Sequence, residues 1–90
     1  MSIIRVASGS RTAAVAGAIA GLFREQGFVE VQAIGPAAVN QAIKATVLAK
    51  GYLAEEGKDI LFVPSMLEVE VGDVVRTAVR LTVESKGGKL

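Results

Sequence analysis

The first half of the chain alternates twice between a short apolar run, typical of a strand, and a longer segment that is typical of a helix. These four segments are residues 3–7, 11–26, 28–34 and 35–50. Gly27 is placed to end the first helix and Gly51 the second, and Pro36 suits a first helical turn, where the amide has no helical partner. Two strands joined through a helix lie parallel in one sheet. The sequence therefore predicts an α/β fold.

A third strand is predicted for residues 59–63, and Pro64 should end it or bulge it, because proline has no amide hydrogen to give to a neighbouring strand. A hairpin follows, and residues 86–90 are expected to form a flexible tail. The element order is therefore β-α-β-α-β-β, in a single domain of residues 1–85. We expect an α+β two-layer sandwich, in which a mixed four-stranded sheet carries both helices on one face.

The hairpin has apolar and polar residues in alternation on both sides of Gly72-Asp73. A two-residue turn at this pair would set Val69 opposite Arg76, an apolar residue against a charged one. A shift of one residue would place apolar residues opposite apolar ones throughout. We therefore expect a three-residue loop or a bulge at the turn, and ion pairs between the glutamates of the hairpin and the arginines of the last strand.

Each helix is expected to bury one apolar face. In the second helix the buried stripe is predicted to contain Val39, Ile43 and Val47, and the opposite stripe Asn40, Gln41, Lys44 and Leu48. In the first helix, Gly17 and Gly21 each cost about 1 kcal/mol relative to alanine. We therefore expect these glycines to allow the close approach of a sheet or of another helix.

Hydrophobic residues make up 51% of these 90 residues, and charged residues only 21%. A domain of this size leaves roughly a third or more of its surface in contact with water. Few charges are available to cover that surface. We therefore expect a homo-oligomer, a dimer or a tetramer, in which a partner covers an apolar face. The sheet face that the helices leave open is the candidate.

The chain contains neither cysteine nor histidine. This excludes disulfides, thiol nucleophiles, Cys/His zinc sites and imidazole acid–base chemistry. No acidic residue lies at a sequence spacing from a base or a nucleophile that would indicate a catalytic pair. We therefore expect no enzymatic activity, no cofactor and no metal. A run of about 18 apolar residues, which a membrane span needs, is missing, and Met1-Ser2 leads directly into a strand pattern. We therefore expect neither a signal peptide nor a membrane span, and a cytoplasmic location.

Polar and basic side chains gather where the two predicted helices begin. Ser10 is predicted to be the N-cap of the first helix, and Arg11 follows it. The exposed stripe of the second helix carries Asn40, Gln41 and Lys44. Both helix starts lie at the edge of the sheet where parallel strands end, and helix N-termini attract anions. We interpret these five residues as a site that contacts a nucleic-acid backbone; the alternative is a serine cap followed by a solvated polar face.

The charge of the chain is divided unevenly along the sequence. Residues 1–52 carry five basic and two acidic side chains, a charge of +3, and residues 53–90 carry five basic and seven acidic ones, a charge of −2. The net charge of +1 is too small to predict a nucleic-acid partner by itself. The electropositive half is nevertheless the half that holds both helix starts.

Four stretches of the chain closely resemble the stage V sporulation protein S family. They are residues 15–27, 31–53, 59–64 and 77–84. The resemblance implies a small bacterial regulatory protein linked to sporulation and to events at the cell envelope. That family is in turn similar to the Alba group of small dimeric nucleic-acid-binding proteins, which share the β-α-β-α-β-β order.

In the Alba group, basic residues at the start of the first helix and along the second helix contact nucleic acid. The matching positions here are Ser10, Arg11, Asn40, Gln41 and Lys44. The group often has two lysines where this chain has Arg11 alone. Alba proteins also extend a basic hairpin arm, whereas this hairpin carries Glu68, Glu70 and Asp73. The resemblance therefore does not extend to insertion of the arm into a groove.

Three functions are compatible with these features. The first is a non-enzymatic, oligomeric regulator that holds a nucleic-acid backbone, with neither DNA nor RNA singled out. The second is a protein-interaction adaptor that uses an apolar surface and binds no nucleic acid. The third is a sensor of a small anion or a nucleotide at the helix starts.

Overall fold

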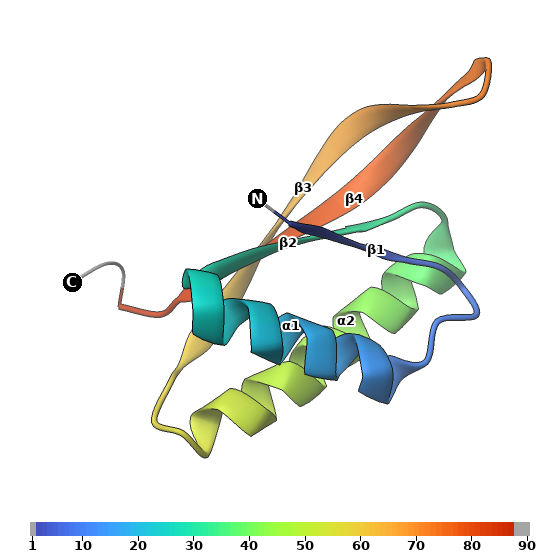
Figure 1. Ribbon diagram of the computed structural model, residues 1–90. Helices are drawn as coiled ribbons and strands as arrows, with labels where there is room; N and C mark the ends of the chain where they lie inside the picture. Colours follow the sequence, from blue (N-terminus) through green and yellow to red (C-terminus); the bar gives the residue numbers. More distant parts are fainter. Residues whose placement is uncertain (1, 88–90) are drawn as a thin grey trace.

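Six elements make up residues 2–87, which the computed structural model describes (Figure 1). They are β1 (Ile3–Val6), α1 (Thr12–Gln26), β2 (Phe28–Ala33), α2 (Pro36–Ala54), β3 (Ile60–Val71) and β4 (Val74–Ser85). The strand order is β1-β2-β4-β3, with β1 and β2 parallel and the other neighbours antiparallel. Both helices cover one face of this sheet (Figure 1). The predicted element order and the mixed four-stranded sheet are confirmed.

The core lies between this sheet and the two helices. The central strands contribute valines and a leucine, and α1 contributes Ile19 and Phe23. The face that α2 buries is built mainly from alanines. These buried residues are Ala38, Ala42, Ala45, Thr46, Ala49 and Leu53. The hydroxyl of Thr46 donates a hydrogen bond of 2.8 Å to the Ala42 carbonyl, so this polar side chain is satisfied inside the core.

The predicted core stripe of α2 is wrong. Val39 is only partly buried, and the side chains of Ile43 and Val47 are 41% and 54% exposed. Short side chains let a helix approach its neighbours closely, and an alanine face therefore packs where a valine face would hold the helix away. The larger apolar residues of α2 consequently lie at the surface.

Glycine ends the first helix but not the second. Gly27 ends α1 as predicted, in the left-handed region at φ 81°, and its amide donates a hydrogen bond of 2.8 Å to Phe23 O. The expected end at Gly51 is wrong, because α2 continues to Ala54. The added turn places Leu53 in the core with no exposed surface. Burial of a leucine contributes about 2 kcal/mol, which exceeds the cost of about 1 kcal/mol for one helical glycine.

Within residues 2–87, no close contact requires a glycine at the two glycine positions inside α1. A Cβ added at Gly17 or Gly21 would meet no neighbouring atom within 4 Å. The expectation that these glycines allow a sheet or helix of the same chain to come close is therefore wrong. They leave a flat strip of small side chains on the outer surface of α1.

Pro64 neither ends nor bulges the third strand. β3 runs without interruption through Pro64, which pairs in register with Leu81. The strand tolerates the proline because it lies at the edge of the sheet, where one side of the backbone has no strand to receive an amide hydrogen. The two predicted segments thus form one strand of 12 residues.

The turn of the hairpin also differs from the prediction. Gly72 and Asp73 form a two-residue turn, so that Val69 pairs with Arg76. Gly72 has φ 63°, and no residue other than glycine has a positive φ among residues 2–87, which gives the turn type II′ geometry. The mixed register costs little because the turn region is exposed on both faces, with Val71, Val74 and Val75 between 51% and 56% exposed.

This register separates the charged groups that were expected to pair. Glu68 lies opposite Thr77 and Glu70 opposite Val75, so neither glutamate faces an arginine of β4. The predicted ion pairs across the hairpin are therefore wrong. Arg80 instead donates a hydrogen bond of 3.0 Å to the Ser65 hydroxyl.

The outer part of the hairpin, residues 67–78, extends beyond the rest of the sheet, and we call it the arm. β2 pairs with β4 only as far as Ala33, which lies opposite Val79. The arm therefore projects past the carboxyl end of β2, at the end of the molecule where both helices begin (Figure 1).

Two remaining expectations concern the ends and the environment of the chain. Part of the tail predicted for residues 86–90 lies outside the described residues, and the amide of Lys86 donates a hydrogen bond of 2.8 Å to Asp59 O. Within residues 2–87, no helix is both long and apolar enough to cross a membrane.

Candidate functional site

The two helix starts are joined by a hydrogen bond from the side chain of Gln41. Its Nε2 donates to Ser10 O at 2.7 Å and lies 3.3 Å from the Thr12 hydroxyl oxygen. The helices meet in this way because α1 and α2 follow neighbouring parallel strands that end at the same edge. The fold therefore brings together the two groups of residues that the sequence singled out.

The prediction that Ser10 is the N-cap of α1 is wrong. The N-cap of α1 is Arg11, and no side chain caps this helix. The Ser10 hydroxyl accepts a hydrogen bond of 2.9 Å from the Ala7 amide, while the Ser10 amide donates one of 3.0 Å to Ala7 O. Ser10 thus closes the turn between β1 and α1.

Both helix starts keep their first-turn amides free of side-chain caps. The N-cap of α2 is Gly35 at φ 90°, which has no side chain to offer, and Pro36 follows it. Neither helix has an acidic residue in its first turn. The partial positive charge of each helix end is therefore not neutralised by a side chain of its own helix.

The cations beside these helix starts are exposed. Arg11 adjoins Ser10, and Lys44 lies one turn after Gln41 on the same stripe of α2. Neither cation forms an ion pair within residues 2–87. Asn40 is exposed as well, whereas Gln41 is partly buried and its amide nitrogen holds the helices together. We call Ser10, Arg11, Asn40, Gln41 and Lys44 the helix-start surface.

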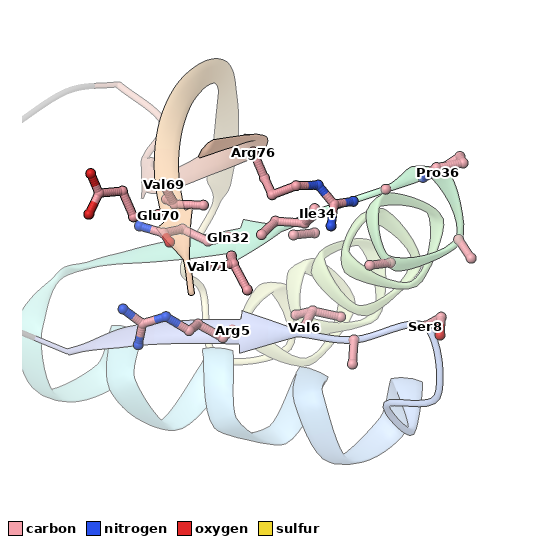
Figure 2. A pocket seen from close by; sticks show the side chains of 15 residues that line it. Arg5, Val6, Ser8, Gln32, Ile34, Pro36, Val69, Glu70, Val71 and Arg76 are labelled. Atoms are coloured by element: carbon pink, nitrogen blue, oxygen red, sulfur yellow. The ribbon is translucent and has the colours of Figure 1, made fainter. Parts of the chain in front are cut away.

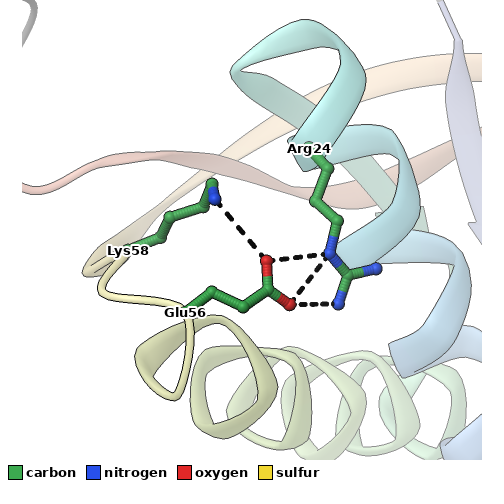
Figure 3. Close-up of polar contacts among 3 residues, drawn as sticks. All are labelled: Arg24, Glu56 and Lys58. Atoms are coloured by element: carbon green, nitrogen blue, oxygen red, sulfur yellow. Dashed lines mark hydrogen bonds and ion pairs between the residues drawn. The ribbon is translucent and has the colours of Figure 1, made fainter.

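Most ion pairs lie at the opposite end of the molecule. The guanidinium of Arg24 donates to both carboxylate oxygens of Glu56, with the shortest contact 2.6 Å, and Lys58 lies 3.5 Å from the same carboxylate (Figure 3). The hydrogen bonds from Arg24 hold the pKa of Glu56 below its ordinary value. These pairs join the last turn of α1 to the turn that follows α2, whereas no ion pair forms at the helix-start surface within residues 2–87.

A pocket of about 630 Å³ lies between the arm and the carboxyl ends of β1 and β2 (Figure 2). We call it the arm pocket. Its walls include Arg5 from β1 and Arg76 from the arm, and its central part is apolar. Sequence reasoning missed both arginines as site residues. The signal for Arg5 is a charge inside an apolar run, whereas Arg76 reaches the pocket only through the two-residue turn.

The open face of the sheet is polar in its centre. Gln32 is only 8% exposed, and its Nε2 donates a hydrogen bond of 2.8 Å to Glu30. Arg80 lies 3.9 Å from the same glutamate. This network satisfies the polar groups in the centre of the face, while Ile3, Leu61 and Val63 expose apolar side chains on its two edge strands. A second group of exposed apolar residues lies elsewhere on the molecule.

Those residues line the side of α2 that faces β3. Lys50 lies on this side, and its Nζ donates a hydrogen bond of 2.8 Å to Ile60 O. Met66 of β3 is 73% exposed and points to the helix-covered side, since it pairs with Val79. We call Val39, Ile43, Val47, Phe62 and Met66 the α2–β3 apolar surface.

The fold is shared with a solved structure. This chain superposes on Alba from Thermoplasma volcanium with a TM-score of 0.59, over 92% of this chain and 99% of the other, at 16% sequence identity. The likeness shows an Alba-like fold. Residues 2–86 match the family model of stage V sporulation protein S, which covers nearly the whole chain. The chain therefore belongs to the stage V sporulation protein S family, a sporulation-related family with an Alba-like fold.

Proposed function

We propose that this protein is a non-enzymatic regulator in the cytoplasm that binds the backbone of nucleic acid at its helix-start surface. The observation that carries the proposal is the position of Arg11 and Lys44. Both cations flank the hydrogen bond between Gln41 and Ser10, and neither is neutralised within residues 2–87. Arg11 is the N-cap of α1, and a cation next to uncapped helix amides is a suitable place for a phosphate group. Lys44, about two turns into α2, supplies a second cation for the backbone.

Residues of this surface reach phosphates and not bases. Arginine and lysine side chains and helix amides contact the backbone of any sequence. The arm is acidic at Glu68, Glu70 and Asp73, which argues against its insertion into a groove. We therefore expect weak sequence preference and strong dependence on salt.

A second copy would double the number of these contacts. We propose that the α2–β3 apolar surface forms a homodimer, because Ile43, Val47 and Met66 expose large apolar side chains on one side of the molecule. Arg11 and Lys44 then supply four cations for each dimer. Four phosphate contacts weaken binding to duplex DNA by about two orders of magnitude between 50 and 200 mM salt, and two contacts by only about tenfold.

A protein-interaction adaptor is the second candidate. The side of α2 toward α1 exposes Leu48 and Tyr52, each by 40%. An exposed tyrosine and leucine suit a protein partner. Such an adaptor would capture its partner equally well at low and high salt.

Fluorescence anisotropy with labelled duplex DNA, single-stranded DNA and RNA tests the proposal at two salt concentrations. The variant is Arg11→Gln/Lys44→Gln, and the matched control is Lys58→Gln/Lys86→Gln, which removes the same charge at the opposite end. We expect the first pair to lose binding and the control to retain it. Equal loss in both variants would show that only net charge matters, and no binding at low salt would refute the proposal.

A further inference from the structure

The arm pocket has the size and position of a ligand site. Its volume of about 630 Å³ lies within the range of small-molecule sites, roughly 300–1,000 Å³. It opens where β1 and β2 end, beside Ser8 and Gly35, which precede the two helix starts. The pocket therefore borders the two segments that lead into the helices, although no residue of the helix-start surface lines it.

The unusual register of the arm builds one wall of this pocket. Because Val69 pairs with Arg76, the two side chains lie on the same face of the arm, together with Val71. The register that matches apolar with apolar residues would turn Arg76 to the opposite face. The observed turn thus puts a guanidinium at the edge of an apolar wall, above Val6 of β1 (Figure 2).

The polar groups lie at the two ends of the pocket. Arg76 extends over Ile34 toward the start of α2, whereas Arg5 and Glu70 lie at the other end (Figure 2). Among the described residues, neither Arg5 nor Arg76 takes part in an ion pair or a side-chain hydrogen bond. An unpaired guanidinium beside an apolar cavity fits a ligand that has a flat apolar body and an anionic group.

We propose that the arm pocket binds one nucleotide, with its phosphate between Arg76 and the start of α2 and its base against the apolar wall. The proposal rests on the proposed function, since a strand held at the helix-start surface passes the mouth of the pocket. The guanidinium of Arg76 can also stack on a base. The Glu70 carboxylate points away from the apolar wall (Figure 2).

A nucleotide can enter only when its base is unstacked. Bases of an intact duplex stay stacked and paired, and their removal costs a few kcal/mol. Single strands, bulges and free nucleotides carry no such cost. The pocket therefore predicts that single strands bind more tightly than a duplex, although the phosphates of both can reach Arg11 and Lys44.

Two pocket variants separate this proposal from backbone binding. Arg76→Gln removes the phosphate contact, and Ala37→Leu fills the pocket from α2 without a change of charge. We expect each to weaken single-strand binding about tenfold and duplex binding by less than twofold. Lys86→Gln, at the opposite end, is the control for Arg76→Gln. If the pocket variants weakened single-strand and duplex binding equally, the proposed nucleotide site would be refuted, whereas the proposed backbone binding would still hold.

Amide shifts in ¹H–¹⁵N spectra of the whole protein identify the ligand. The probes are adenosine monophosphate, adenosine and inorganic phosphate. We expect the monophosphate to shift Ser8, Gly35 and Val71 and to saturate, and adenosine to shift the same amides more weakly. Equal effects of phosphate and the monophosphate would refute a base site. Saturation by the monophosphate without any strand binding would support the pocket and refute the proposed function.

Discussion

The side-chain amide of Gln41 on α2 donates a hydrogen bond of 2.7 Å to the carbonyl oxygen of Ser10, two residues before α1 begins. This bond joins segments that are 31 residues apart in the sequence. It links the two helix starts, and Arg11 directly follows Ser10 while Lys44 lies one turn after Gln41. Gln41 is therefore a positioning residue for the proposed backbone contacts.

Gln41→Ala should weaken both the fold and the binding of nucleic acid. Loss of this hydrogen bond removes about 1 kcal/mol of the free energy of unfolding. The midpoint of urea denaturation measures that change, and anisotropy at low salt measures the affinity. Gln26→Ala is the control, since Gln26 is an exposed glutamine at the opposite end of α1. Equal effects of the two substitutions would contradict the positioning role of Gln41.

Acid should destabilise the protein partly through Glu56. Hydrogen bonds from Arg24 lower the pKa of Glu56 in the folded state, so the unfolded chain binds this proton more readily. The stabilisation is complete above the ordinary glutamate pKa of about 4.3, and it is lost as the pH falls through the lower folded value. Glu56→Gln should therefore flatten the fall in stability below about pH 5.

The neighbouring glutamate provides the control for that measurement. Glu55 is exposed, and it has no ion-pair partner within residues 2–87. Glu55→Gln should leave the pH dependence of the urea midpoint unchanged. A parallel change in both variants would show that the Arg24 contact contributes nothing specific.

The elements of this fold could be predicted because their signals are local. Gly27 and Pro36 mark helix boundaries through their own backbone chemistry, and neither signal depends on distant residues. The face that α2 buries could not be predicted in this way. Ile43 is more hydrophobic than Ala42, but the distance from the sheet to the helix decides which side chain fits, and that distance is a property of the whole fold.

The candidate site could be predicted only in part, for a related reason. Ser10 and Gln41 meet because parallel strands end at one edge, which follows from the element order. Arg5 and Arg76 reach one pocket through the register of an exposed arm, where burial does not select the pairing. Pairing apolar residues with apolar residues across the hairpin therefore predicts a strand register that the chain does not adopt.

Gly17→Ala should stabilise the isolated protomer. An added Cβ has open space around it, and alanine favours a helix over glycine by about 1 kcal/mol. Thermal unfolding at low protein concentration measures this gain. Gly72→Ala is the contrasting variant, because φ 63° is unfavourable for alanine and its substitution should destabilise the arm. A loss of stability in Gly17→Ala would show that another molecule packs against α1.

Ile43→Glu/Val47→Glu should convert the proposed dimer into a folded monomer. Both side chains are exposed in the protomer, so two charges there cost little in folding but prevent burial of the α2–β3 apolar surface against a second copy. Light scattering coupled to size-exclusion chromatography measures the mass, and circular dichroism verifies the fold. The control is Val74→Glu/Val75→Glu on the arm, where both valines are 56% exposed. The monomer should also show about half the salt slope of duplex binding, since it offers half the cations. An unchanged mass, or a monomer already in the wild type, would contradict the proposed interface.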